Sequence, residues 1–528
     1  MPQSRWSPQW PVSKGQGREV PDWLVFAGFR SVVTSMAGFA AARRLQRSAD
    51  RRATLVFAEP IVSEIRLTTS SRNLFMSTRG NLTNNNGIRF GPLMLCLVPV
   101  MSVALAGCGW RGKSSTKSTI DSSKANRSLS RNSSDPCAVV LAPQTGKDRV
   151  DQEIARWQEE ARRMADSRAI EQLGWMFVSK ARLSYDPGYY RLAEQSARCI
   201  ESSHPGSPEA LLLRGHALHN LHHFREAEAV ARELVARREM FLDYGLLGDA
   251  LVEQGRLTEA AHAYQKMVDL RPGPESYSRA AYLRWLKGDL AGALELMRVV
   301  TRAASPRDPD SAAWAYSRLA LYELQAGETK KALEACGAAL DFQLDYAPAL
   351  LARGRILLAK GQDEEAIAAL QLAATSNPLP DYQWTLADAL RVVGRVEQAR
   401  SVEAQMIGQG AASDPRTLAL YLATRNEQIE TALQLAEREL QTRGDVFTLD
   451  AIAWSLRAAG RAEEAHARMK QALAEGTEDA RLFFHAGVIA AELGQNGEAQ
   501  QWLKKAAGIR QMLLPSEQEQ LSRHLAAL

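Results

Sequence analysis

The strongest constraint on this 528-residue chain is an internal repeat that runs from residue 174 to residue 508. Its clearest mark is an alanine that returns at spacings of 34, 33, 33, 39, 34, 33, 33, 33 and 34 residues: Ala193, Ala227, Ala260, Ala293, Ala332, Ala366, Ala399, Ala432, Ala465 and Ala499. A fixed period of this length is the signature of stacked supersecondary units. We therefore predict ten consecutive units.

A second small residue stands twelve places before each alanine in nine of the ten units. These residues are Ala181, Gly215, Gly248, Ala281, Ala320, Gly354, Ala387, Ala453 and Gly487, and Leu420 is the exception. We expect the two small positions to meet where two antiparallel helices approach most closely. Glycine seven places later, as at Gly255, suits a left-handed helix end, and proline, as at Pro272, cannot continue the second helix. The sequence predicts an all-α chain of helical hairpins.

Residues 241–272 and 347–378 resemble the tetratricopeptide repeat (TPR) family most closely, with glycine, alanine and proline in the matching places. The resemblance implies a right-handed superhelical solenoid of about ten helix-turn-helix repeats. A longer loop over residues 303–312 accounts for the single 39-residue spacing. We expect an N-terminal capping helix over residues 148–173 and a C-terminal cap over residues 509–528. The repeat that starts near Ser413 is the least regular.

An export signal is predicted ahead of the repeats. Residues 91–107 are uncharged and apolar, Arg79 and Arg89 precede them, and Leu105-Ala106-Gly107-Cys108 follows. This order is typical of a secretory signal. The last four residues resemble the bacterial lipobox, which implies lipidation of Cys108. Residues 76–108 are then the signal segment, and residues 109–147 form a polar flexible tether.

Two alternatives remain for the apolar run, a single uncleaved transmembrane helix and a buried helix. The run is near the lower length limit for spanning a bilayer. Because the signal starts some 75 residues into the chain, we interpret residues 1–75 as a misassigned start or a disordered segment, with Met76 as the initiator. The first 150 residues carry 21 Lys and Arg against 8 Asp and Glu, so the rest has a net charge of −8. Nucleic-acid binding by the repeats is therefore disfavoured.

The cysteines fit neither a zinc site nor a disulfide framework by their spacing. Cys336 falls on an apolar helix face and is interpreted as a core residue. His216, His219 and His223 share one helical face at a spacing that could bind metal, with His222 beside them, but no carboxylate or cysteine completes a set. We favour a structural role and predict no metal and no cofactor. No catalytic motif appears, and the repeats leave no room for a catalytic domain, so we predict no enzymatic activity.

The TPR resemblance implies that the first helix of each unit lines a concave groove that binds a protein partner. Aromatic and arginine side chains dominate interface hot spots. Carried onto this sequence, the groove positions are Arg279, Tyr282, Trp285, Trp314, Arg318, Arg355, Trp384, Asp388, Tyr421, Arg425 and Trp454. Several of them could instead pack against adjacent repeats. The Lys and Asn pair by which chaperone-linked TPR proteins hold a C-terminal carboxylate is missing, so that ligand is not expected.

The leading hypothesis is a non-catalytic scaffold, lipid-anchored in the bacterial cell envelope and facing the periplasm or the exterior. It would bind a peptide segment or a subunit during secretion, pilus or polysaccharide-export assembly. The alternatives are a soluble cytoplasmic TPR adaptor or regulator, and a metal-dependent activity at the histidines.

Overall fold

A computed structural model describes residues 135–164 and 166–528, which all fall within one compact unit. Residues 1–75, the signal segment at 76–108 with Cys108, and most of the expected tether lie outside the described residues. Among the described helices, none has the length and apolar character needed to cross a bilayer.

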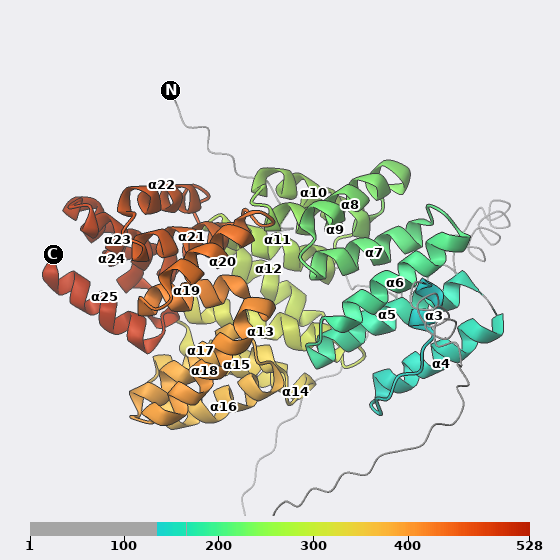
Figure 1. Cartoon of the computed structure of the whole chain (residues 1–528), viewed down its shortest axis with the longest axis horizontal. Coiled ribbons are helices and arrows are strands. Elements are labelled where there is room, and N and C mark those ends of the chain that lie inside the picture. The colour runs from blue at the N-terminus through green and yellow to red at the C-terminus, as the bar shows by residue number, and fades with distance from the viewer. Residues whose placement is uncertain (1–134, 165) are drawn as a thin grey trace, which may run out of the picture. The chain divides into compact units, whose positions relative to one another are not determined.

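Ten antiparallel helix pairs follow one another along the chain, which confirms the predicted all-α TPR solenoid (Figure 1). The pairs are α5 (Ser167–Ser184) with α6 (Gly188–Ser203), α7 (Pro208–Asn220) with α8 (Phe224–Arg238), α9 (Phe241–Glu253) with α10 (Leu257–Leu270), α11 (Pro274–Leu286) with α12 (Leu290–Arg302), α13 (Pro309–Gln325) with α14 (Thr329–Phe342), α15 (Ala347–Ala359) with α16 (Asp363–Ser376), α17 (Pro380–Val392) with α18 (Val396–Ser413), α19 (Pro415–Arg425) with α20 (Ile429–Leu440), α21 (Val446–Ala458) with α22 (Ala462–Leu473), and α23 (Ala480–Glu492) with α24 (Asn496–Gly508).

The glycine at the end of the first helix has the left-handed backbone that the sequence predicts. Gly255 has φ 74° and Gly361 has φ 70°, and the equivalent glycines of five other repeats agree. The glycine that stands twelve places before the recurring alanine meets a different residue from the one predicted. A Cβ at Gly248 would lie 2.2 Å from the Tyr264 ring, four places beyond the alanine expected to meet it. The small residue therefore makes room for a large side chain from the second helix.

The ends of the array differ from the predicted boundaries. The short helix α3 (Pro136–Val140) lies inside the expected tether, and α4 (Arg149–Met164) occupies most of the expected cap. The first repeat begins at Ser167, because Asp166 accepts a hydrogen bond from the Arg168 N–H and ends the α4–α5 turn. The C-terminal cap consists of a 3₁₀ turn, η2 (Arg510–Met512), and α25 (Pro515–Ala527).

The two irregular places in the repeat have local causes. The expected loop at 303–312 is shorter than predicted, because α13 starts at Pro309 with Asp308 accepting from the Ser311 N–H at 3.2 Å. The other place is the junction of repeats seven and eight, where α18 is long, α19 is short, and α19 ends on Asn426 with φ 50° instead of a glycine.

Later repeats pack directly against earlier ones, which the repeat pattern does not predict. The Gly444 N–H, between α20 and α21, donates to the Glu253 carbonyl at the end of α9 over 3.1 Å. One repeat further along both segments, the Thr477 hydroxyl donates to the Leu286 carbonyl at 2.5 Å. One repeat further again, the Gln511 amide donates to the Leu324 carbonyl at 3.1 Å. The turns of repeats three to five therefore hold the loops that follow repeats eight to ten.

Candidate binding surface

Three aromatic residues of the predicted groove are buried. Trp384, Tyr421 and Trp454 are 3%, 2% and 1% exposed. Trp384 packs edge-on against Tyr421 with ring centroids 5.6 Å apart, and the Arg481 guanidinium lies 4.8 Å from its ring. Trp454 stacks on His485 at 3.8 Å. In this structure these three side chains pack between neighbouring repeats, and a partner cannot reach them.

Trp285 is part of the contact between early and late repeats. Its ring stacks on Phe447 of α21 with centroids 5.9 Å apart, and its Nε1–H donates to Gln325 at 2.8 Å. The Gln325 amide in turn donates to the Glu478 carbonyl at 2.7 Å. A tryptophan predicted to face a ligand thus faces the chain's own ninth repeat.

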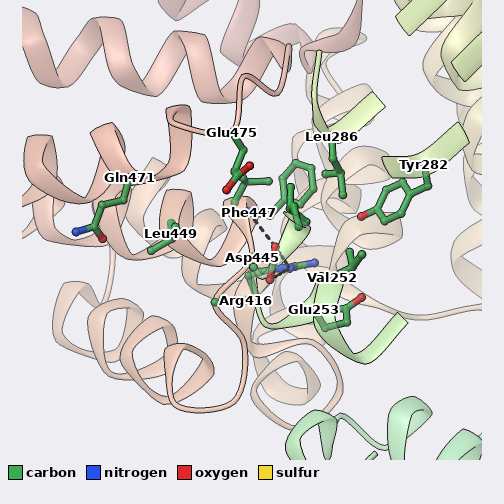
Figure 2. A pocket seen from close by; sticks show the side chains of 14 residues that line it. Val252, Glu253, Tyr282, Leu286, Arg416, Asp445, Phe447, Leu449, Gln471 and Glu475 are labelled. Atoms are coloured by element: carbon green, nitrogen blue, oxygen red, sulfur yellow. Dashed lines mark hydrogen bonds and ion pairs between the residues drawn. The ribbon is translucent and has the colours of Figure 1, made fainter. Parts of the chain in front are cut away.

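Beside this contact lies a small cavity, whose wall includes Tyr282, Glu253, Arg416, Asp445 and Phe447 (Figure 2). Its volume is about 80 Å³. Arg416 and Asp445 form an ion pair at 3.2 Å across it. Small-molecule sites usually measure about 300–1,000 Å³. The cavity therefore suits water or one side chain and does not suit a cofactor.

Arg279 and Arg355 are held by carboxylates of the preceding or following repeat. Arg279 pairs with Asp249 at 2.7 Å, and Arg355 pairs with Asp381 at 2.5 Å. Burial raises the pKa of Asp249, but the ion pair with Arg279 outweighs burial and lowers that pKa overall. Both guanidinium groups already have a counter-charge.

Asp388 and Arg425 lie toward the C-terminal end of the predicted groove. Asp388 is buried and accepts from the Ser516 N–H of α25 at 3.0 Å. Burial raises the pKa of Asp388 to about 6. Arg425 pairs with Glu427 at 3.4 Å. Neither residue offers a free charge to a ligand.

Tyr282, Trp314 and Arg318 remain from the predicted groove, because none of them is fully buried and none pairs with a carboxylate of the described residues. Trp314 is 40% exposed, the largest exposed fraction for a tryptophan among the described residues, and Arg318 lies four residues along the same helix, α13. The Arg318 guanidinium lies 5.4 Å from the Tyr282 ring of the preceding repeat. We call these three residues the inner-face cluster.

A second cavity of about 280 Å³ lies between α19, α21, α23 and α25. Its lining includes Arg457, Arg523 and His524, and the sequence does not reveal this set because the α25 side chains lie outside the repeat pattern. Arg457 pairs with Glu492 at 2.6 Å, and Arg523 approaches Glu519 at 3.7 Å. These charges are also matched within the chain.

Three of the four histidines contact aromatic rings. His216 lies against Trp175, His219 meets the Phe224 ring edge-on with centroids 5.4 Å apart, and His222 stacks on that ring at 5.5 Å. Burial, with the charge of Arg182, lowers the pKa of His216 well below its usual value. His223 pairs with Glu226 at 3.2 Å. Within residues 135–164 and 166–528, no group of three or more His, Cys, Asp or Glu side chains is arranged to hold a metal ion.

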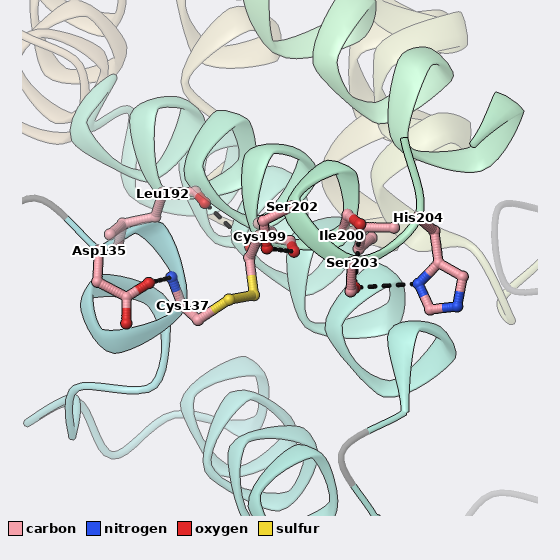
Figure 3. Close-up of a disulfide and its surroundings, with 9 residues drawn as sticks. Asp135, Cys137, Leu192, Cys199, Ile200, Ser202, Ser203 and His204 are labelled. Carbon is pink, nitrogen blue, oxygen red and sulfur yellow. Dashed lines mark hydrogen bonds between the residues drawn. A yellow bond between two sulfur atoms is a disulfide. The ribbon is translucent and has the colours of Figure 1, made fainter. Parts of the chain in front are cut away.

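Two cysteines form a disulfide, so the prediction that the cysteine spacing fits no disulfide was wrong. Cys137 of α3 is bonded to Cys199 of α6, 62 residues later, with Cα atoms 4.9 Å apart (Figure 3). Asp135 begins α3 by accepting from the Cys137 N–H at 3.0 Å. Spacing alone could not reveal this pair, because α3 lies in a segment interpreted as a tether. Cys336 is free and buried, as predicted.

Comparison with protein families identifies tetratricopeptide repeats at residues 212–273, 246–312, 317–380 and 451–511. Residues 381–450, which include the irregular eighth repeat, are not matched, although α17 to α20 form two helical hairpins there. Comparison with curated protein sequences gives no match.

Three solved structures are similar to the chain at low TM-scores. A tetratricopeptide repeat protein from Parabacteroides merdae ATCC 43184 is 16% identical, with 48% of this chain and 98% of that chain covered and a TM-score of 0.29. The human IFIT1 dimer with PPP-AAAA is 15% identical, with 61% and 78% covered and a TM-score of 0.40. The APC/C hetero-tetramer Cut9–Hcn1 is 13% identical, with 73% and 99% covered and a TM-score of 0.28. No functional inference follows from likeness at this level. From its own repeats and helix pairs, the described chain is an all-α tetratricopeptide-repeat solenoid.

Proposed function

We propose that the protein is a non-catalytic scaffold, lipid-anchored through Cys108 in the bacterial cell envelope, that binds a protein partner at the inner-face cluster. The partner would be a peptide segment or a subunit of a secretion, pilus or polysaccharide-export assembly. The exposed Trp314 carries the binding part of the proposal, because a large aromatic side chain exposed beside an arginine is typical of an interface anchor.

The disulfide supports the cellular location. Disulfides persist in oxidising compartments such as the bacterial periplasm and are rare in the cytosol. The Cys137–Cys199 bond lies 29 residues beyond Cys108, at the start of the folded part. A soluble cytoplasmic adaptor, the alternative function, would leave this bond without an oxidising environment. The presence of this disulfide therefore favours an exported chain whose lipid anchor lies just ahead of its first helices.

Radioactive palmitate should label the full chain expressed in a bacterial host, and Cys108→Ser should remove the label. Lipidation requires the thiol of that cysteine, so no other residue can replace it. Cys96→Ser is the matched control, because Cys96 lies within the same apolar run and should leave labelling unchanged. Equal labelling of the Cys108→Ser variant and the wild type would reject the lipid anchor and favour the cytoplasmic adaptor.

Trp314→Ala should weaken partner binding by well over tenfold, since loss of a true aromatic anchor typically costs about 2–4 kcal/mol. The partner can first be found by placing a photo-crosslinking amino acid at position 311 in living cells, because Ser311 is partly exposed one helical turn before Trp314 on α13 and Trp314 itself is kept. Position 372 on α16 is the control, because Leu372 is 61% exposed on a second helix of its repeat. Circular dichroism checks that Trp314→Ala stays folded. Unchanged binding by the folded variant would show that the partner uses another surface.

A further inference from the structure

Arg318 differs from four other arginines on the first helices of the repeats. Arg279, Arg355, Arg416 and Arg481 each contact a carboxylate at 2.5–3.2 Å. Among the described residues, no carboxylate lies within ion-pair distance of Arg318, and its only polar side-chain contact is the Tyr322 hydroxyl at 3.4 Å. A half-buried guanidinium without a counter-charge is costly, and an arriving anion would relieve that cost.

Two aromatic rings hold the Arg318 guanidinium in place. Its Cζ atom lies 5.4 Å from the centres of both the Tyr282 and Tyr322 rings. Burial alone would lower the pKa of Arg318, but the phenols of Tyr322 and Tyr282 outweigh burial and raise it, so the group stays charged. Apart from the long contact with the Tyr322 hydroxyl, no polar side chain among the described residues engages its N–H donors, which therefore remain for a ligand. A planar guanidinium binds a carboxylate through two such donors.

The spacing between Arg318 and Trp314 determines how far apart two contacting groups of a ligand must lie. Residues four apart on a helix lie about 6 Å apart along its axis and share one face. In an extended peptide, side chains two residues apart share one face and lie about 6.6 Å apart. The two spacings agree, so one extended segment can contact Arg318 and Trp314 together.

We propose that the inner-face cluster binds an extended segment of the partner protein that carries an aspartate or glutamate side chain at Arg318 and an apolar side chain two residues away at Trp314. This inference rests on the proposed function and specifies the chemistry of its partner. The ligand is an internal acidic side chain and not a chain terminus.

A fluorescein-labelled peptide, Ser-Leu-Gly-Glu-Gly-Leu-Ser, tests the proposal by fluorescence anisotropy with the full-length protein. Leucines on both sides of the glutamate make the probe independent of chain direction. Two matched peptides serve as controls, one with glutamine for glutamate and one with leucines directly beside the glutamate. We expect saturable binding of the first peptide and at least tenfold weaker binding of both controls to the unchanged protein. The glutamine control needs no protein variant, so misfolding cannot produce its result.

Arg318→Gln should weaken binding of the first peptide by at least tenfold, and Arg318→Lys should recover only part of it, because lysine lacks the planar fork. Arg353→Gln on the exposed side of α15 is the matched charge control and should bind like the wild type. No saturable binding by the wild type, or equal binding by a folded Arg318→Gln variant, would overturn the proposal. So would stronger displacement by a 5′-phosphorylated RNA oligonucleotide than by unlabelled peptide.

The same variant separates this inference from the proposed function. If the crosslinked partner is lost on Trp314→Ala and kept on Arg318→Gln, the scaffold function stands and the acidic specificity fails. If peptide binding depends on Arg318 while partner capture does not depend on Trp314, the acidic specificity of the cluster stands and the proposed scaffold function through Trp314 fails.

Discussion

Gly255→Ala should destabilise the array much more than Gly361→Ala, although both glycines occupy the same place in their repeats. Both have a positive φ, 74° and 70°, so both substitutions cost about 1–2 kcal/mol for a left-handed backbone with a side chain. Only at Gly255 does the new Cβ meet a neighbour, the Gly444 carbonyl oxygen at 2.2 Å; at Gly361 nothing lies within 4 Å. Relieving that clash should add about 1–3 kcal/mol.

The difference between the two variants measures the contact between repeats three and eight. Chemical denaturation gives the free energy of unfolding of each variant. Hydrogen exchange gives a local measurement at the Gly444 N–H, which donates to the Glu253 carbonyl. Its exchange rate should rise in Gly255→Ala and stay at the wild-type value in Gly361→Ala. Equal unfolding free energies with unchanged exchange would mean that repeats three and eight do not touch in solution.

This contact marks the limit of what the repeat pattern predicts. The alanine and glycine positions encode how two helices of one hairpin pack, and the structure has all ten hairpins. They carry no information about which distant repeats meet. The residues that form the contacts between distant repeats, such as Thr477 and Gln511, lie in loops or after the last repeat. At those places the repeat pattern allows most residue types.

The sequence predicts which helix position each residue of the candidate site occupies. It predicts only in part which of these side chains a partner can reach. Helical position places Trp314, Trp384 and Trp454 on the first helices of their repeats, as the structure has them. Trp384 is covered because Arg481, three repeats further along, lies over its ring. That cover depends on the path of the whole array, and position within one repeat cannot reveal it. Arg318 differs from Arg279, Arg355, Arg416 and Arg481 through the carboxylates that the fold brings to those four, and position within one repeat does not reveal those contacts either.

Cys137→Ala with Cys199→Ala should lower the stability of the N-terminal end of the array by about 4 kcal/mol, the value expected for a link across a 62-residue loop. Without the bond, α3 is held mainly by buried Val140 and by the Gln158 amide, which donates to the Val140 and Ala142 carbonyls at 2.8 Å. Because repeats couple mainly to their neighbours, the loss should be largest in α3 to α6. Hydrogen exchange of the Leu141 N–H, which donates to the Cys137 carbonyl, reports it directly.

Reductant supplies the control for this variant. Reducing the wild type should reproduce the faster exchange in α3, whereas the double variant should not respond, because it has no bond to break. In denatured but unreduced protein, Cys336 should react with iodoacetamide while Cys137 and Cys199 stay protected. Alkylation of all three would show that the bond does not form. The folded end of the chain would then lose its attachment to α6, and the argument for an oxidising compartment would fall with it.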